Sequence, residues 1–406
     1  MNKTKPNTKT AFAFLVSLFF MWAFLTALND ILIPFVKELF DFGYTEAALV
    51  QFCFFGAFAL MAMPASIVLD KFGYRRGIVL GLCTMGVGAF LFYPASKVVY
   101  YPLFLGALFI LATGVTMLQV AANPYVAVMG KPETAASRLN LAQGVNSFAK
   151  ILAPQFGAFL ILNNIENLPK VQQAEAVQIP YIALAIALVS LAVVFSFLNL
   201  PNIRDLDSMQ EDKLQPTTGK TIWDYPHLIL GAVAIFFYVG AEVCIASYLT
   251  NLLGEPDIAG LAPENAAPYL SYYWGGLMVG RFIGAAVLQK VKSQNLLSLM
   301  AFIAIILLLV GVSTTGWLAG GCIIAVGLCL SIMWSNIFTL AIDGLGKFTS
   351  KGSGLLVTAI VGGAILPLVQ GNIADGFGLQ ISYLIPIISF SYILFYGLKG
   401  HKVGKA

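Results

Sequence analysis

The sequence predicts an all-α membrane protein with twelve transmembrane helices arranged as two six-helix bundles. Three observations predict this class. Only 10% of the 406 residues are charged and 59% are hydrophobic, whereas soluble domains average about 25% charged residues. Apolar runs long enough to span a bilayer, about 20 residues each, recur along the whole chain. One longer charged stretch separates the first half of these runs from the second half.

The apolar runs follow one another in order between charged loops. The first run is too long for a signal peptide and lacks a small-residue cleavage site, so we expect it to be the first span. The charged stretch predicts three parts: a bundle at 1–200, a linker at 201–222 and a bundle at 223–406. The predicted spans lie near 11–36, 46–69, 77–96, 101–130, 136–163 and 178–199, and then near 224–252, 267–289, 295–315, 317–342, 352–374 and 379–398.

Basic residues predict the orientation of the chain. Loops rich in Lys and Arg stay in the cytoplasm, and here such loops share one side with the linker and both ends of the chain. The opposite side holds only Lys37, Lys97 and Lys170, among several acidic residues. We therefore expect both termini to lie in the cytoplasm of a bacterium, with the protein in its inner membrane.

Composition also excludes several functions. The five cysteines lack CxxC spacing and the two histidines are far apart, so we expect no disulfide, metal or other cofactor site. Ser147 and Lys150 match an S-x-x-K pattern, but its supporting motifs are missing. We therefore expect no catalytic residue and no enzyme activity. Without a G-x-x-x-x-G-K-[ST] loop, ATP cannot drive the protein. No basic cluster lies outside the loops, so the net charge of +4 fits a membrane face better than a nucleic-acid surface. The lipid bilayer is the expected surrounding, and the chain is expected to be a monomer.

A buried acid organises the first span. Asn29 and Asp30 interrupt a run of apolar residues, and a carboxylate at this depth usually faces a cavity, a bundle interior or a partner. We interpret Asp30 as the coupling acid of a transporter and Asn29 as part of its substrate site. Lys150 lies about 18 Å inside the fifth span at 1.5 Å per residue. It either pairs with Asp30 or extends towards water.

Carboxamides follow on the fourth and fifth spans. Gln119 and Asn123 are four residues apart, and Asn140, Gln143 and Asn146 are spaced by three, so each set shares a helical face. Amides both donate and accept hydrogen bonds, which suits the hydroxyl groups of a sugar. The alternative is that they join helices, for about 0.6 kcal/mol each. The number of amides favours a sugar site.

The second half repeats these features weakly, as carriers with paired, broken helices do. Glu242 matches Asp30 in its span and lies one turn after Tyr238. It is a candidate ion or sugar ligand, or a bond to a neighbouring helix. Asn336 and Trp334 offer an amide and a stacking ring, although tryptophan also anchors at membrane interfaces. Arg281 lies near the inner end of the eighth span and is expected to serve a gate.

The loop LDKFGYRRG, residues 69–77, joins the second and third spans. So short a loop requires Gly73 for its turn, and Asp70 can then cap a helix or pair with Arg75 or Arg76. The alternative is an ordinary positive-inside loop. The stretch resembles the signature loop of the major facilitator superfamily, with Ser66 in place of the first glycine. That resemblance implies that Asp70 and Arg76 form an inner-gate latch.

Longer motifs resemble the fucose–galactose–glucose:cation symporter family within this superfamily. The resemblance implies a twelve-helix facilitator that takes up a hexose with a cation. It places Asp30 at the proton-carrying aspartate and Gln143 and Asn146 at sugar-contacting amides. The motifs are ALNDILIP, LQVAANPY, LNLAQGVNSF, FYVGAEV, YYWGGLMVGRFIG, AIDGLG and GSGLLVTAIVGGAILP.

One residue departs from the fucose branch. Gln119 occupies the position of that branch's second acid, and an amide cannot carry a proton. The LQVAANPY form is similar to the glucose/galactose members, so we expect a glucose or galactose symporter coupled to H⁺ or Na⁺. The alternatives are a carrier of another solute, such as N-acetylglucosamine, fucose or a drug, and a sugar sensor that does not transport.

Overall fold

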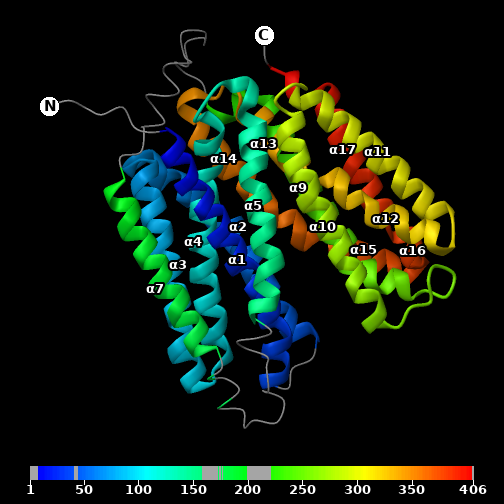
Figure 1. Cartoon of the computed structure of the whole chain (residues 1–406), viewed down its shortest axis with the longest axis horizontal. Helices are drawn as coiled ribbons and strands as arrows, with labels where there is room; N and C mark the ends of the chain where they lie inside the picture. The colour runs from blue at the N-terminus through cyan, green and yellow to red at the C-terminus, as the bar shows by residue number, and fades with distance from the viewer. Residues whose placement is uncertain are drawn as a thin grey trace. The chain divides into compact units, whose positions relative to one another are not determined.

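The structure, a computed structural model of the whole chain, describes residues 8–40, 44–157, 172, 175, 177–198 and 221–404. In these ranges the helices follow the predicted spans one after another (Figure 1), and no strand occurs. The all-α class is confirmed. The α-helices are α1 (Thr8–Phe40), α2 (Tyr44–Phe72), α3 (Tyr74–Val98), α4 (Tyr101–Val128), α5 (Ala135–Gly157), α7 (Gln178–Phe197), α9 (Pro226–Gly254), α10 (Pro263–Val287), α11 (Ser293–Ser313), α12 (Gly316–Leu330), α13 (Met333–Ile342), α14 (Thr349–Thr358), α15 (Gly362–Phe377), α16 (Leu379–Ser382) and α17 (Leu384–Leu398). Short 3₁₀ turns are η1 (Pro132–Thr134), η3 (Ile222–Asp224), η4 (Gly346–Phe348), η5 (Ala359–Val361) and η6 (Gly400–Lys402).

Hydropathy sets two of these helices apart. Within the described residues, 10 helical segments are long and apolar enough to cross a membrane. Neither α5 nor α10 is among them. Polar side chains at membrane depth face a bundle interior or a cavity, so these two helices are where a functional site is expected.

The described chain forms two compact units. The first unit falls within Met1–Met129, Val145–Leu214 and Thr349–Thr358, and the second within Gly130–Gly144, Gln215–Phe348 and Ala359–Ala406. Each unit therefore includes a short stretch from the other half of the sequence, and α5 is divided between them. The predicted linker lies largely at 201–220, outside the described residues, so the domain boundaries at 1–200 and 223–406 stay a prediction.

In the first unit, α3 packs against α4 and α7, as Figure 1 shows, and α2 packs against α4 and α14. The backbones of α3 and α4 are close because Gly114 lies at their contact: a Cβ there would lie 2.5 Å from the Met85 nitrogen and 2.6 Å from the Gly81 oxygen. Small residues permit such approach in membranes. Phe92 of α3 stacks on Tyr181 of α7, with ring centroids 4.1 Å apart.

In the second unit, α9 is central and packs against α10, α13, α15 and α17. Three spans are interrupted among the described residues, the last of them at Tyr383, between α16 and α17. The tenth span breaks between α12 and α13, so that α13 begins at Met333, directly before Trp334. The eleventh breaks at η5, which separates α14 from α15. These breaks place polar residues of α13 where helical continuity is lost.

Candidate functional site

Asn140 connects three helices of the second unit. Its side chain is fully buried. The Nδ2 atom donates to the backbone oxygen of Arg281 at 2.7 Å, and Oδ1 accepts from the Ser335 hydroxyl at 3.1 Å. One turn earlier, Ser137 donates to the Ala285 oxygen at 2.5 Å. Both polar ends of Asn140 are engaged by protein, which favours a connecting role. Its predicted contact with sugar stays a prediction.

The other two amides of α5 lie on either side of the boundary between the units. Gln143 is buried in the second unit, and its backbone oxygen accepts from Arg281 Nη1 at 3.0 Å. Asn146 is buried in the first unit, and its Nδ2 donates to the Phe19 oxygen at 3.1 Å. The predicted stripe therefore exists on α5, with its inner and outer parts held by different neighbours.

A polar and aromatic cluster occupies the second unit. We call Tyr238, Glu242, Tyr273, Arg281 and Trp334 the α9–α10–α13 cluster. The Tyr238 hydroxyl lies near the Glu242 carboxylate and the Arg281 guanidinium but has no hydrogen-bond partner among the described residues. Tyr273 donates to the backbone oxygen of Glu242 at 3.1 Å. The ring centroids of Trp334 and Tyr238 are 6.2 Å apart.

Burial makes this cluster a candidate ligand site. Only 9% of Glu242 and 6% of Trp334 are exposed. The indole N–H of Trp334 is buried and has no hydrogen-bond partner in the described part of the chain. Buried polar groups are normally satisfied, so an unmet donor beside a carboxylate and aromatic faces suits a hydroxylated ligand.

On α4, Asn123 turns towards its own helix. Its Nδ2 donates to the Gln119 oxygen at 2.9 Å, while its buried Oδ1 has no partner among the described residues. Asn29 and Asp30 belong to helix α1, but the described part of the structure does not include their side chains. Lys150 is half-buried. The coupling role of Asp30 and its pairing with Lys150 therefore stay predictions.

Asn336 joins α13 to the start of α11. Its side chain is fully buried, and Nδ2 donates to the Ser293 oxygen at 3.2 Å. The Oδ1 atom has no partner among the described side chains and backbone. The bond to Ser293 favours the joining of helices over the predicted contact with sugar, which stays a prediction.

The loop after α2 has the predicted turn. Gly73 adopts a φ of 81°, a conformation that favours glycine. Asp70 accepts a hydrogen bond from the hydroxyl of Ser350, in the first turn of α14, where a negative charge is favourable. Arg75 and Arg76 are exposed. A latch between Asp70 and Arg76 stays a prediction.

Serines supply the connections that sequence reasoning missed. Ser335 and Ser350 bond the side chains of Asn140 and Asp70, and Ser353 of α14 donates to the Val120 oxygen of α4 at 2.9 Å. Helical serines often bond their own backbone instead, as Ser66 does to the Met63 oxygen at 2.7 Å. Because nothing in the sequence separates the two cases, no pattern identified these serines.

Metal binding has no support in the described part of the chain, where no group of three or more His, Cys, Asp or Glu side chains converges. The five cysteines are free thiols. Two of them, Cys244 and Cys329, are buried, as expected of small residues that pack between helices.

Comparison with known proteins gives the family. The profile of the Major Facilitator Superfamily matches residues 10–368. The chain belongs to the major facilitator superfamily. A glucose/galactose transporter of Brucella abortus is 49% identical to this facilitator over 399 residues, 98% of this chain and 96% of the relative. The L-fucose-proton symporter of Escherichia coli is 34% identical over 405 residues, 95% of this chain and 92% of the symporter.

A solved structure agrees with this assignment. The crystal structure of the Escherichia coli fucose:proton symporter matches the facilitator with a TM-score of 0.84 and 30% identity, over 96% of this chain and 98% of that one. The facilitator is therefore a multi-pass membrane transporter of the sugar symporter family and not an enzyme.

Proposed function

We propose that this facilitator imports glucose or galactose together with H⁺ or Na⁺ by alternating access. The α9–α10–α13 cluster carries the proposal, because a sugar would meet an aromatic face, a carboxylate acceptor and the unmet indole donor of Trp334. Identity with a glucose/galactose transporter supports a hexose as substrate. Asn29, Gln119, Asn123, Gln143 and Asn146 stay proposed partners of the sugar.

Asp30 is the proposed coupling acid. If a proton is the coupled ion, Asp30 must be protonated, and therefore neutral, when the binding site changes from one side of the membrane to the other. The sugar must then bind more tightly to the protein when Asp30 is protonated. If sodium is coupled, the Asp30 carboxylate would be a ligand. One charge that crosses the membrane is worth about 2.3 kcal/mol per 100 mV, so a single acid is sufficient to drive accumulation.

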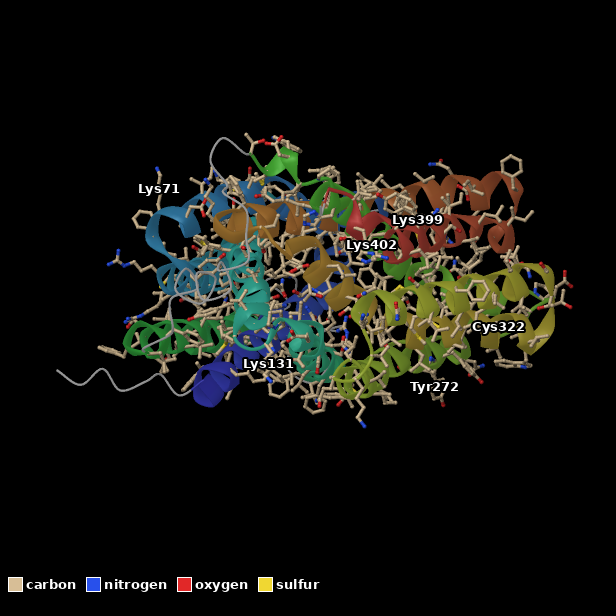
Figure 2. The ribbon with its side chains drawn as sticks, turned by 90° about the horizontal axis from the view of Figure 1, so that it is seen from above. Lys71, Lys131, Tyr272, Cys322, Lys399 and Lys402 are labelled. Carbon is tan, nitrogen blue, oxygen red and sulfur yellow. The ribbon has the colours of Figure 1, made fainter. Side chains whose placement is uncertain are left out.

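We further propose a monomer in the inner membrane of a bacterium, with both termini in the cytoplasm. Exposed lysines at helix ends support this orientation. The Lys71 side chain projects from the end of α2, and Lys399 and Lys402 lie exposed at and after the end of α17 (Figure 2).

Uptake by purified protein in proteoliposomes tests the proposal. Labelled glucose, galactose, fucose and N-acetylglucosamine are offered separately under an imposed proton or sodium gradient. We expect glucose or galactose to accumulate under one gradient only. Asp30→Asn should abolish accumulation and leave sugar exchange at equilibrium intact. Accumulation by Asp30→Asn would refute its coupling role, and binding without uptake in the wild type would indicate a sensor.

A further inference from the structure

Arg281 lies where the α9–α10–α13 cluster meets the inner half of α5. It is 4% exposed, and an arginine at this depth requires compensating partners. Its guanidinium lies beside the Tyr238 hydroxyl and donates through Nη1 to the Gln143 oxygen at 3.0 Å. One side chain therefore contacts both the candidate ligand site and α5.

The glycines on either side of Arg281 hold α10 in place. A Cβ on Gly280 would lie 2.4 Å from the Ser331 Oγ, and a Cβ on Gly284 would lie 2.2 Å from Ile332 Cγ2. The Gly-x-x-x-Gly spacing thus lets α10 contact the break between α12 and α13 directly. These contacts hold α10 against the break between α12 and α13. Movement of the Arg281 guanidinium would therefore change the hydrogen bond from Arg281 to α5 without shifting α10 itself.

The inner half of α5 is bonded to α10 at several points within the second unit. Ser137 and Asn140 donate to the backbone oxygens of Ala285 and Arg281 at 2.5 and 2.7 Å. The bond from Arg281 to Gln143 is made by a charged donor. Such bonds are roughly twice as strong as neutral ones, and here the donor is a side chain of the cluster.

We propose that Arg281 is the positioning residue that transmits occupancy of the α9–α10–α13 cluster to the inner half of α5. The inference rests on the proposed function. A sugar hydroxyl or cation beside Glu242 and Tyr238 competes with the guanidinium for its position, which weakens the bond to Gln143 and releases α5. In the empty site Arg281 keeps α5 attached. A ligand shifts such an equilibrium only by its difference in affinity for the two states.

Labelling of one reporter cysteine tests this role. The reporter is Ser137→Cys, in a background whose native cysteines are replaced by serine or alanine. Ser137 is 6% exposed while it contacts Ala285, so a water-soluble maleimide reacts only after α5 is released. Nanodiscs expose both membrane faces to the reagent. Rates are measured with and without galactose and glucose, for Arg281→Gln, Arg281→Lys and the control Arg138→Gln.

The control is matched because Arg138 also lies on inner α5 but bonds locally, to the Lys131 oxygen at 3.0 Å and Thr134 Oγ1 at 2.7 Å. We expect sugar to accelerate labelling of the background and of Arg138→Gln. Arg281→Gln should label about tenfold faster or more without sugar, as expected for a lost charged hydrogen bond, and should not respond to sugar. Arg281→Lys should fall between them.

Two results would overturn the inference: background-like labelling of Arg281→Gln, or faster labelling with the full sugar response, which a structural role alone would give. If Arg281→Gln does not fold, Asn140→Ala provides the test. It should label fast without sugar yet still respond, because Arg281 is intact, and a lost response would contradict the inference. If no hexose is transported or alters labelling, the proposed function fails, while the rates without sugar still test the contact.

Discussion

Gly284→Ala is the sharpest test of how α10 is held. The added Cβ would lie 2.2 Å from Ile332 Cγ2 and 2.7 Å from Asn140 Nδ2. Ile332 is β-branched and stiff at χ1, so the backbone before α13 must move. Such overpacking costs about 1–3 kcal/mol. A displaced Asn140 also loses its bond to the Arg281 oxygen, about 0.6 kcal/mol in membrane proteins. The expected loss is about 2–4 kcal/mol.

The same helix offers a matched control. A Cβ on Gly275 meets nothing within 4 Å, and Gly→Ala in a helix stabilises by roughly 0.5–1 kcal/mol. The two substitutions should therefore have opposite signs. Thermal unfolding of the purified proteins in detergent, followed by tryptophan fluorescence, should show Gly284→Ala below the wild type and Gly275→Ala at or above it. Equal unfolding temperatures for the two variants would refute the close contact of α10 with α13.

Two further substitutions test individual contacts. Trp334→Phe keeps a six-membered aromatic ring but removes the indole donor and leaves a small cavity. The KM for sugar should rise about tenfold, the value of one hydrogen bond, with a small loss of thermal stability. An unchanged KM would exclude that donor from the site. Ser350→Ala and Asp70→Ala each remove the hydrogen bond between these two side chains, so the double variant should unfold no earlier than the less stable single variant. Additive losses in detergent unfolding would contradict their pairing.

The spans and the turn at Gly73 could be predicted because they follow from local chemistry. A helix must have an apolar run long enough to cross the lipid bilayer, and a tight turn with positive φ favours glycine. The structure confirms the turn at Gly73 and the all-α class, with 10 apolar spanning segments among the described residues. It also shows what run length cannot give: the tenth span stops at Leu330 and resumes at Met333. That break lies directly against Gly280 and Gly284, which are distant in sequence.

The roles of the amides were less predictable than their positions. Helical spacing places Asn140, Gln143 and Asn146 on one stripe, but it does not show which neighbouring helix each amide contacts. That helix is α10 for Asn140 and α1 for Asn146. For Asn336 it is α11. A side-chain amide forms a hydrogen bond with any carbonyl that tertiary packing places next to it. An amide that binds sugar and an amide that joins two helices therefore look the same in the sequence.

The number of charges moved per sugar follows from the acids that are present. Gln119 cannot carry a proton, and the proposed function uses Glu242 as a hydrogen-bond acceptor for the sugar. With Asp30 as the single proposed coupling acid, one charge should move with each sugar. One charge at 100 mV is worth about 2.3 kcal/mol, which balances a sugar gradient of about 40-fold, since 1.4 kcal/mol is tenfold. Two charges would balance about 2000-fold.

Reversal of flux in proteoliposomes measures this number directly. An imposed potassium diffusion potential, with pH and sodium equal on both sides, is opposed by increasing sugar gradients until net flux stops. We expect the wild type and Glu242→Gln to stop at the gradient for one charge. Because the two alternatives differ about 50-fold in that gradient, the assay separates them clearly. A wild type that balances two charges and a Glu242→Gln variant that balances one would make Glu242 a second coupling acid.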